Sequence, residues 1–109
     1  MKKTLVCTAL LGAPTLLAAV EAFLDPANWE GRTDIWKIEN GSVIGETKED
    51  PKYNTFFCSK KKYGDFELSF KVQLKDEVGN SGVQIRSKVL DKAKWSVAGP
   101  QCDMGAVYW

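Results

Sequence analysis

The sequence predicts an all-β protein made of short antiparallel strands. Apolar runs alternate with Gly, Asn, Asp and Pro about every ten residues, the spacing of strands joined by turns. After residue 22, no stretch of convincing length has the 3.6-residue period of an amphipathic helix. The 109-residue chain has room for one domain, because a β-sandwich takes about 100 residues.

Residues 1–22 are predicted to be a secretory signal peptide. Lysines at positions 2 and 3 precede an apolar stretch from Leu5 to Val20, and the small-residue pattern Val20-Glu21-Ala22 follows. This order is typical of a signal cleaved near Ala22. The stretch is shorter than the ~20 apolar residues of a membrane span. We therefore expect an exported protein, periplasmic or secreted, that does not span the membrane after cleavage.

The charge balance argues against a nucleic-acid partner. Removal of residues 1–22 takes two of the 15 basic side chains and one of the 14 acidic ones, which leaves 13 of each in residues 23–109. Proteins that bind nucleic acid usually carry a basic surplus that neutralises phosphates. The predicted mature chain is close to neutral, so no nucleic-acid partner is expected.

Alternation of apolar and polar residues places the strands. They are expected at residues 35–39, 42–46, 54–58, 66–75, 81–87 and 101–103. Asn40-Gly41 predicts a tight hairpin turn, because both residues tolerate positive φ. Residues 66–75 alternate most cleanly and are expected to direct one face, Phe66, Leu68, Phe70, Val72 and Leu74, to the core.

The last residues of the sequence, Val107-Tyr108-Trp109, are also strand-like. Chain termini more often fray in polar residues. We therefore expect residues 23–109 to be the N-terminal part of a longer β-sandwich domain.

Two cysteines remain in the predicted mature chain. Cys58 and Cys102 could form a disulfide in an oxidising compartment, or they could be two separate thiols that pack as small hydrophobes. Their spacing in the sequence does not decide between these alternatives, because a disulfide depends on the distance between the two Cα atoms.

The chain contains no histidine, which removes several kinds of catalytic site. Ser-His-Asp and Cys-His arrangements and histidine metal sites are all excluded. Any chemistry must use carboxylates, amides, Arg, Lys or Tyr.

The strongest candidate set lies on two predicted strands. Gln84 and Arg86 share one face of the first strand, and Gln101 and Asp103 share one face of the second. Together they could line a polar groove for a sugar, whose buried hydroxyls each cost about 1–3 kcal/mol when left without a partner. The alternative is that all four are ordinary outward-facing residues, with Arg86 and Asp103 in a weak surface pair.

Two further residues are weaker candidates. Glu46 follows an apolar strand and a glycine that permits close approach, although such a residue is more often a solvated strand end. Trp95 lies in a loop and could stack on the apolar face of a sugar ring, whereas Trp36 alternates with Ile38 and is expected in the core.

Six segments, taken in order, carry a resemblance to a known family. They are residues 34–41, 43–47, 54–58, 65–68, 80–87 and 101–103. In this order and spacing they resemble the 3-keto-disaccharide hydrolase family over essentially all of residues 23–109. The resemblance implies an antiparallel β-sandwich of the jelly-roll, concanavalin A-like type, with a concave sheet that acts on a carbohydrate oxidised at C3.

The resemblance also implies a reaction and roles. A ketone at C3 acidifies the hydrogen on C2, so that a base can expel the glycosidic oxygen by β-elimination before water adds back. Arg86, Asp103 and Glu46 are expected to be catalytic, with Asp103 or Glu46 as the base or as a ligand of a divalent cation. No other cofactor is expected. The substrate-binding set is expected to be Gln84, Gln101, Asn80 and Trp95.

The sequence departs from the family pattern before Trp29, where the first segment is short, and after Asp103, where family members continue with further strands. We expect part of the site to lie in those strands, so that this chain alone would be inactive. Two alternatives to an enzyme stay open, because one fold serves many functions. A lectin-like carbohydrate-binding module would bind unoxidised glycans without turnover, and a structural domain would do neither.

Overall fold

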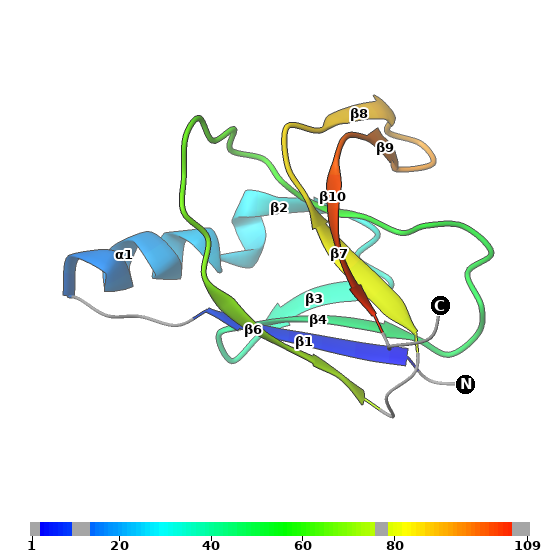
Figure 1. Cartoon of the computed structure of the whole chain (residues 1–109), viewed down its shortest axis with the longest axis horizontal. Helices are drawn as coiled ribbons and strands as arrows, with labels where there is room; N and C mark the ends of the chain where they lie inside the picture. Colours follow the sequence, from blue (N-terminus) through cyan, green and yellow to red (C-terminus); the bar gives the residue numbers. More distant parts are fainter. Residues whose placement is uncertain (1–2, 10–13, 76–78, 106–109) are drawn as a thin grey trace.

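A computed structural model describes residues 3–9, 14–75 and 79–105, and most of their regular structure is β (Figure 1). The strands are β1 Lys3–Ala9, β2 Trp29–Gly31, β3 Trp36–Glu39, β4 Ser42–Thr47, β5 Phe57–Ser59, β6 Phe70–Leu74, β7 Asn80–Gln84, β8 Lys88–Asp91, β9 Ser96–Ala98 and β10 Gln101–Gly105. The helices are α1 Pro14–Phe23 and a short 3-10 helix, η1, Pro26–Asn28. All strand pairs are antiparallel, which confirms the all-β class and agrees with a sandwich.

The main sheet has four strands in the order β3-β4-β1-β6. β1 lies inside it and pairs with β4 from Lys3↔Thr47 to Thr8↔Ser42, and with β6 from Leu5↔Leu74 to Ala9↔Phe70. Among the described strands, β6 pairs with β1 alone. The sheet is therefore continuous only through β1.

The predicted signal peptide overlaps β1 and α1. In this structure of the whole chain, Lys3–Ala9 forms a sheet strand and Pro14–Phe23 forms a helix that extends away from the sheet (Figure 1). Cleavage near Ala22 is a matter of processing and stays a prediction.

Three two-stranded ribbons complete the fold: β2–β5, β7–β10 and β8–β9. The β8–β9 hairpin connects β7 to β10 and lies at the opposite end of the view from the main sheet (Figure 1). Lys92, in its turn, lies 3.3 Å from an oxygen of Glu30 on β2. This exposed ion pair joins two ribbons that are far apart in sequence.

The predicted hairpin at residues 35–46 is confirmed. Asn40 has φ 50° and Gly41 has φ 72°, so both turn residues adopt the left-handed conformation that favours this dipeptide. Strands β3 and β4 pair in register from Trp36↔Gly45 to Glu39↔Ser42. The local turn signal was enough to fix this element.

Other strand boundaries differ from the prediction. Pairing begins at Phe57 rather than at residue 54, and it covers residues 70–74 of the predicted 66–75 strand. β7 ends at Gln84 rather than at residue 87. The short strands β2, β8 and β9 were not predicted. The predicted strand at residues 107–109 and most of the turn at 76–80 lie outside the described residues.

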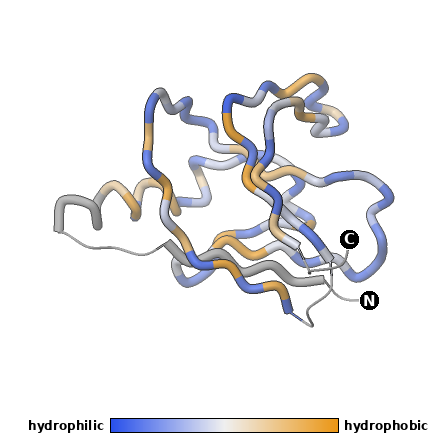
Figure 2. The backbone as a smooth tube through the Cα atoms, viewed as in Figure 1, coloured by the Kyte–Doolittle hydropathy of each residue, from blue (hydrophilic) through white to orange (hydrophobic). Residues whose placement is uncertain are grey.

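Burial is shallow throughout the described part of the chain. No side chain there is fully buried, although Gly45 on β4 is a buried residue. The hydropathy alternates along β6 as the sequence indicated (Figure 2). However, Phe66, Leu68 and Val72 are 47%, 37% and 42% exposed. The predicted core face is half-buried only at Phe70 and Leu74.

Aromatic contacts supply much of the packing. The Trp29 ring stacks on Phe57 at 5.1 Å between centroids and meets the edge of Phe23 at 5.1 Å. The Trp29 indole N–H also donates to the Phe23 carbonyl. These contacts join the end of α1 to the β2–β5 ribbon, and such ring pairs contribute about 0.5–1.5 kcal/mol beyond the area they bury.

Trp36 packs across Gly45, its partner in the neighbouring strand. A Cβ atom on Gly45 would lie 2.5 Å from Cζ3 of the indole, closer than any stable contact. The indole nitrogen donates to Oγ1 of Thr55 at 3.0 Å, which fixes the ring in this position. The absence of a side chain at residue 45 is therefore a requirement of the packing.

We predict that Gly45→Ala destabilises the protein by about 1–3 kcal/mol, because the added methyl must displace Trp36. Urea denaturation followed by tryptophan fluorescence would measure the loss. Gly64→Ala is the matched control, since a Cβ at residue 64 meets nothing within 4 Å. Equal stabilities of the two variants would contradict the role given to Gly45.

Candidate functional site

The candidate site lies on the β7–β10 ribbon. Its antiparallel register pairs Gln84 with Gln101, Gly82 with Asp103, and Asn80 with Gly105. Opposed residues point to the same face of a sheet, and so do alternate residues along each strand. Asn80, Gln84, Gln101 and Asp103 therefore share one face, and we call these four residues the polar strip.

Gly82 makes the close packing of the polar strip possible. A Cβ atom at this position would lie 2.5 Å from Nε2 of Gln101 and 2.7 Å from its Cδ. The Gln101 side chain thus extends across the backbone of β7. Any larger residue at position 82 would displace it.

Hydrogen bonds connect three members of the strip into a relay. Nε2 of Gln84 donates to Oε1 of Gln101 at 3.1 Å, and Nε2 of Gln101 donates to Oδ1 of Asp103 at 2.6 Å. The Ser87 hydroxyl extends the relay at the other end, 3.1 Å from Oε1 of Gln84. Each amide donates toward Asp103, so the relay ends on a charged acceptor, where hydrogen bonds are strongest. Gln101 and Asp103 are both exposed, and the hydrogen bond from Gln101 orients the Asp103 carboxylate.

Arg86 departs from the predicted arrangement. The chain turns after Gln84, and Arg86 has a left-handed backbone with φ 49°, so the alternation that placed it beside Gln84 no longer applies. Its Nη1 donates to the carbonyls of Tyr63 and Gly64 at 3.3 and 2.7 Å, and its Nη2 lies 3.2 Å from Oδ1 of Asp65. The weak pair considered between Arg86 and Asp103 is replaced by this pair with Asp65.

The other two candidates lie on different elements. Glu46 is half-buried on β4 of the main sheet; the pKa of Lys37 is raised mainly by its hydrogen bond with Glu39, and the charge of Glu46 adds a small contribution. Trp95 is half-buried in the turn between β8 and β9, with φ 49°, and Lys92 Nζ lies 5.8 Å from its ring centroid. Among the described residues, Trp95 forms no hydrogen bond or ion pair with the polar strip.

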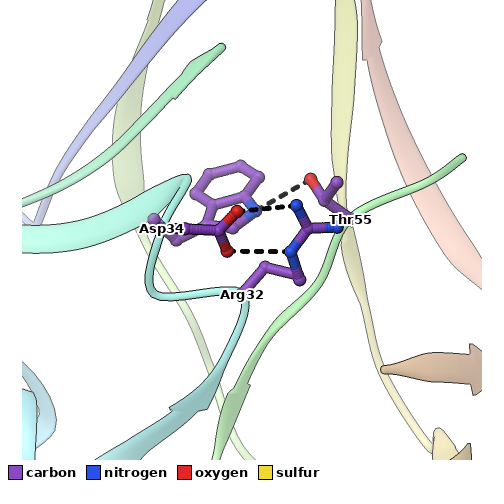
Figure 3. Close-up of polar contacts among 4 residues, drawn as sticks. Arg32, Asp34 and Thr55 are labelled. Atoms are coloured by element: carbon purple, nitrogen blue, oxygen red, sulfur yellow. Dashed lines mark hydrogen bonds and ion pairs between the residues drawn. The ribbon is translucent and has the colours of Figure 1, made fainter. Parts of the chain in front are cut away.

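A second polar cluster surrounds the entrance to β3 (Figure 3). The guanidinium of Arg32 donates two parallel hydrogen bonds to the carboxylate of Asp34, from Nε to Oδ1 at 2.8 Å and from Nη2 to Oδ2 at 2.6 Å. The hydrogen bond from Arg32 lowers the pKa of the Asp34 carboxyl and raises the pKa of the guanidinium. Both carboxylate oxygens are engaged, so Asp34 closes a turn and is not a candidate base.

Cys58 and Cys102 are both free thiols in the structure. Cys58 is half-buried on β5, and burial is the main cause that raises its pKa, with the nearby charge of Glu30 adding to the effect. Cys102 is exposed on β10. A raised pKa keeps the Cys58 thiol protonated near neutral pH, which makes it a poor nucleophile.

The part of the chain that the structure describes contains no group of three or more His, Cys, Asp or Glu side chains placed to hold a metal ion. No helix among the same residues is both long and apolar enough to cross a membrane.

Sequence reasoning missed three contributors to this region. Ser87 joins the relay, Gly82 makes room for Gln101, and the loop around Gly64 holds the Arg86 guanidinium. The glycine at residue 82, within an alternating strand, was the available signal, since such a glycine often marks a close approach of another group.

Comparison with known proteins adds one finding. The sequence model of the family described as 3-keto-alpha-glucoside-1,2-lyase-like domain matches residues 23–108, which confirms the resemblance seen in the sequence. Neither the curated proteins nor the solved structures gave a match.

We predict that the Arg32–Asp34 pair makes stability depend on pH in the acid range. Because the folded-state pKa of Asp34 is lowered, its contribution is complete above the ordinary value of 3.8 and is lost as pH falls through the folded value. Both side chains are partly exposed, so the contribution is below about 1 kcal/mol. Asp34→Asn should be less stable than the parent protein at pH 7 and equally stable near pH 2.

Thermal unfolding of both proteins across this pH range would measure the difference. Glu49→Gln, which removes one exposed carboxylate elsewhere, is the control. If the difference in unfolding temperature between Asp34→Asn and the parent protein is the same at pH 2 as at pH 7, the prediction is contradicted.

Proposed function

The chain belongs to the 3-keto-alpha-glucoside-1,2-lyase-like domain family, and on that basis we propose that it cleaves 3-keto-glycosides by β-elimination followed by hydration. The observation that carries the proposal is a carboxylate fixed by a hydrogen-bond relay, in a chain that matches this family over residues 23–108. A carbohydrate-related family fits a sugar as the partner. We further propose that the protein is exported.

The proposed reaction begins at C2 of the oxidised sugar. The C3 ketone makes the C2 hydrogen acidic, and a carboxylate takes that proton while the C–H electrons form an enolate. The enolate then forms the C1–C2 double bond and releases the glycosidic oxygen, which is protonated as an alcohol. Water adds to C1 of the resulting enone and gives the free 3-keto sugar. The steps require one base and a positive group at the enolate oxygen.

We assign the base to Asp103, because its carboxylate ends the relay from Gln84 and Gln101. Glu46 on β4 is the alternative base, and Asp103 or Glu46 as a ligand of a divalent cation is the alternative role. Amides of the polar strip would bind hydroxyl groups of the sugar, with Asn80 at the far end of β7.

Arg86 is proposed as the positive group at the enolate oxygen. Its side chain is 52% exposed, so the guanidinium has surface open to a ligand even though it also binds the loop at residues 63–65. Trp95 is proposed as an aromatic contact for the substrate from the β8–β9 turn.

We predict that Asp103→Asn lowers kcat/KM for a 3-keto-glucoside by about 10²–10⁴-fold, the usual contribution of a general base. The enone intermediate can be followed by its ultraviolet absorbance and the free 3-keto sugar by chromatography, and circular dichroism would show that the fold is kept. Arg86→Ala should also strongly reduce turnover. Glu49→Gln is the charge-matched control, and Glu46→Gln separates the two candidate bases.

A lectin-like module is the competing function, and the same assay distinguishes it. A module would bind unoxidised glycans, and no 3-keto-glycoside would yield an enone with the parent protein. Binding of an unoxidised glycan together with absence of turnover would remove the enzyme proposal; absence of turnover alone is also what a site completed by further strands would give.

We predict that the exported protein begins at Phe23. This follows from the charged, apolar and small-residue order of residues 1–22. Mass spectrometry of the protein recovered from the medium or periplasm of a bacterial host would measure its first residue. Recovery of the intact chain, with Lys3–Ala9 still present, would contradict the prediction.

A further inference from the structure

The outer edge of β6 carries no strand. β6 is the last strand of the main sheet, and among the described strands it pairs with β1 alone (Figure 1). Besides that pairing, no backbone hydrogen bond within the described part of the chain involves residues 66–74. The edge of β6 that faces away from β1 therefore presents N–H and C=O groups to which a further strand can bind.

Residues 66–69, which precede β6, lack a strand partner as well. The pairing of β1 with β6 ends at Ala9↔Phe70. Residues 66–69 are all exposed and lie outside any strand, although they continue the apolar and polar alternation of β6. The strand predicted over residues 66–75 is therefore shortened because nothing in the described part of the chain pairs with its first half.

One face of this segment is apolar and largely exposed. Phe66, Leu68 and Val72 alternate along it and are 47%, 37% and 42% exposed. Phe70 and Leu74 continue the same face and are half-buried. Side chains on facing strands cover one another when two strands pair. A strand added along the outer edge would shield this face from water.

The opposite face separates its charges between its two halves. Asp65 and Glu67 lie in the first half, and Lys71 and Lys75 lie in the second. Glu67 and Lys71 are exposed, and neither forms an ion pair with any described residue. Two copies of the segment that run antiparallel place the acidic half of each against the basic half of the other. Opposite charges on facing strands attract, and like charges repel.

This charge pattern selects a second copy of the same segment as the partner. In an antiparallel pair centred on Ser69, Glu67 of each copy lies opposite Lys71 of the other. The same alignment places Leu68 opposite Phe70, so apolar side chains meet apolar side chains on the other face. An alignment centred on Lys71 would instead oppose two lysines.

We propose that the protein forms a symmetric dimer in which residues 66–72 of two copies pair antiparallel along the outer edges of β6. The main sheet then continues from one copy into the other, and the interface is self-complementary, as in most homodimers. The dimer is independent of the function proposed above. The contact is one short strand from each copy, less than the about 800 Å² per side of a stable interface, so association is weak and reversible.

Charge-reversal variants test the proposal. Sedimentation of the chain that retains residues 1–22 should show a monomer–dimer equilibrium. Glu67→Lys and Lys71→Glu should each raise the dimer Kd about tenfold, because the symmetry turns two attractive pairs into repulsive ones. The double variant, which carries both substitutions, should associate nearly as well as the parent protein. Lys48→Glu, an exposed charge reversal just after β4, is the matched control.

Hydrogen exchange locates the contact. The backbone amides of residues 66–69 should exchange more slowly as the dimer forms. A protein that stays monomeric at every concentration overturns the proposal, and so does a dimer whose Kd is unchanged in both single variants. A dimer in which residues 66–69 exchange as fast as in the monomer overturns it too. If circular dichroism shows an intact fold and the double variant still fails to associate, the alignment of Glu67 with Lys71 is wrong.

Discussion

The main sheet depends on the backbone pairing of β1. This strand occupies the position between β4 and β6, and β6 has no other strand partner among the described residues. Removal of residues 1–22 would leave the facing edges of β4 and β6 with unpaired N–H and C=O groups. Such edges readily accept another strand. The proposed cleavage would therefore affect the sheet: a chain cleaved near Ala22 must fill this position with another strand or lose the connection to β6.

Shallow burial makes this dependence stronger. With no fully buried side chain among the described residues, the fold has little hydrophobic burial to offset the loss of a strand. Trp36 on Gly45 and the rings around Trp29 are the main packing contacts, and they lie in β3–β4 and in the β2–β5 ribbon. Neither cluster includes β6. Val72 in β6 remains exposed, as do Phe66 and Leu68 before it, although their alternation is that of a core-facing strand.

The sequence predicted those features of the fold that depend on neighbouring residues, namely a tight turn and the alternation of side chains along a strand. Asn40-Gly41 fixed the β3–β4 hairpin, because its two positive φ angles are a property of those residues. Strand parity also placed Gln84 correctly relative to Gln101 and Asp103, since β7 and β10 pair without a bulge. Strand alternation misplaced Arg86. Nothing in the neighbouring sequence predicts its left-handed backbone, and its side chain is held by backbone carbonyls more than twenty residues away. The apolar run of residues 5–20 was equally ambiguous, since such a run suits a signal, a strand or a helix.

The hydrogen bonds within the polar strip help to decide whether its residues bind a sugar or take part in catalysis. A binding module presents free donors and acceptors to its ligand, and each group that it engages internally must be released at a cost. Here Gln84 and Gln101 each commit a donor to a neighbour, and both donations run toward Asp103. An arrangement of this kind holds one carboxylate in a fixed direction, which is what proton abstraction from a defined carbon requires. The relay is therefore suited to positioning a base, and the sugar hydroxyls would be bound by Asn80 and by the amide groups of Gln84 and Gln101 that take no part in the relay.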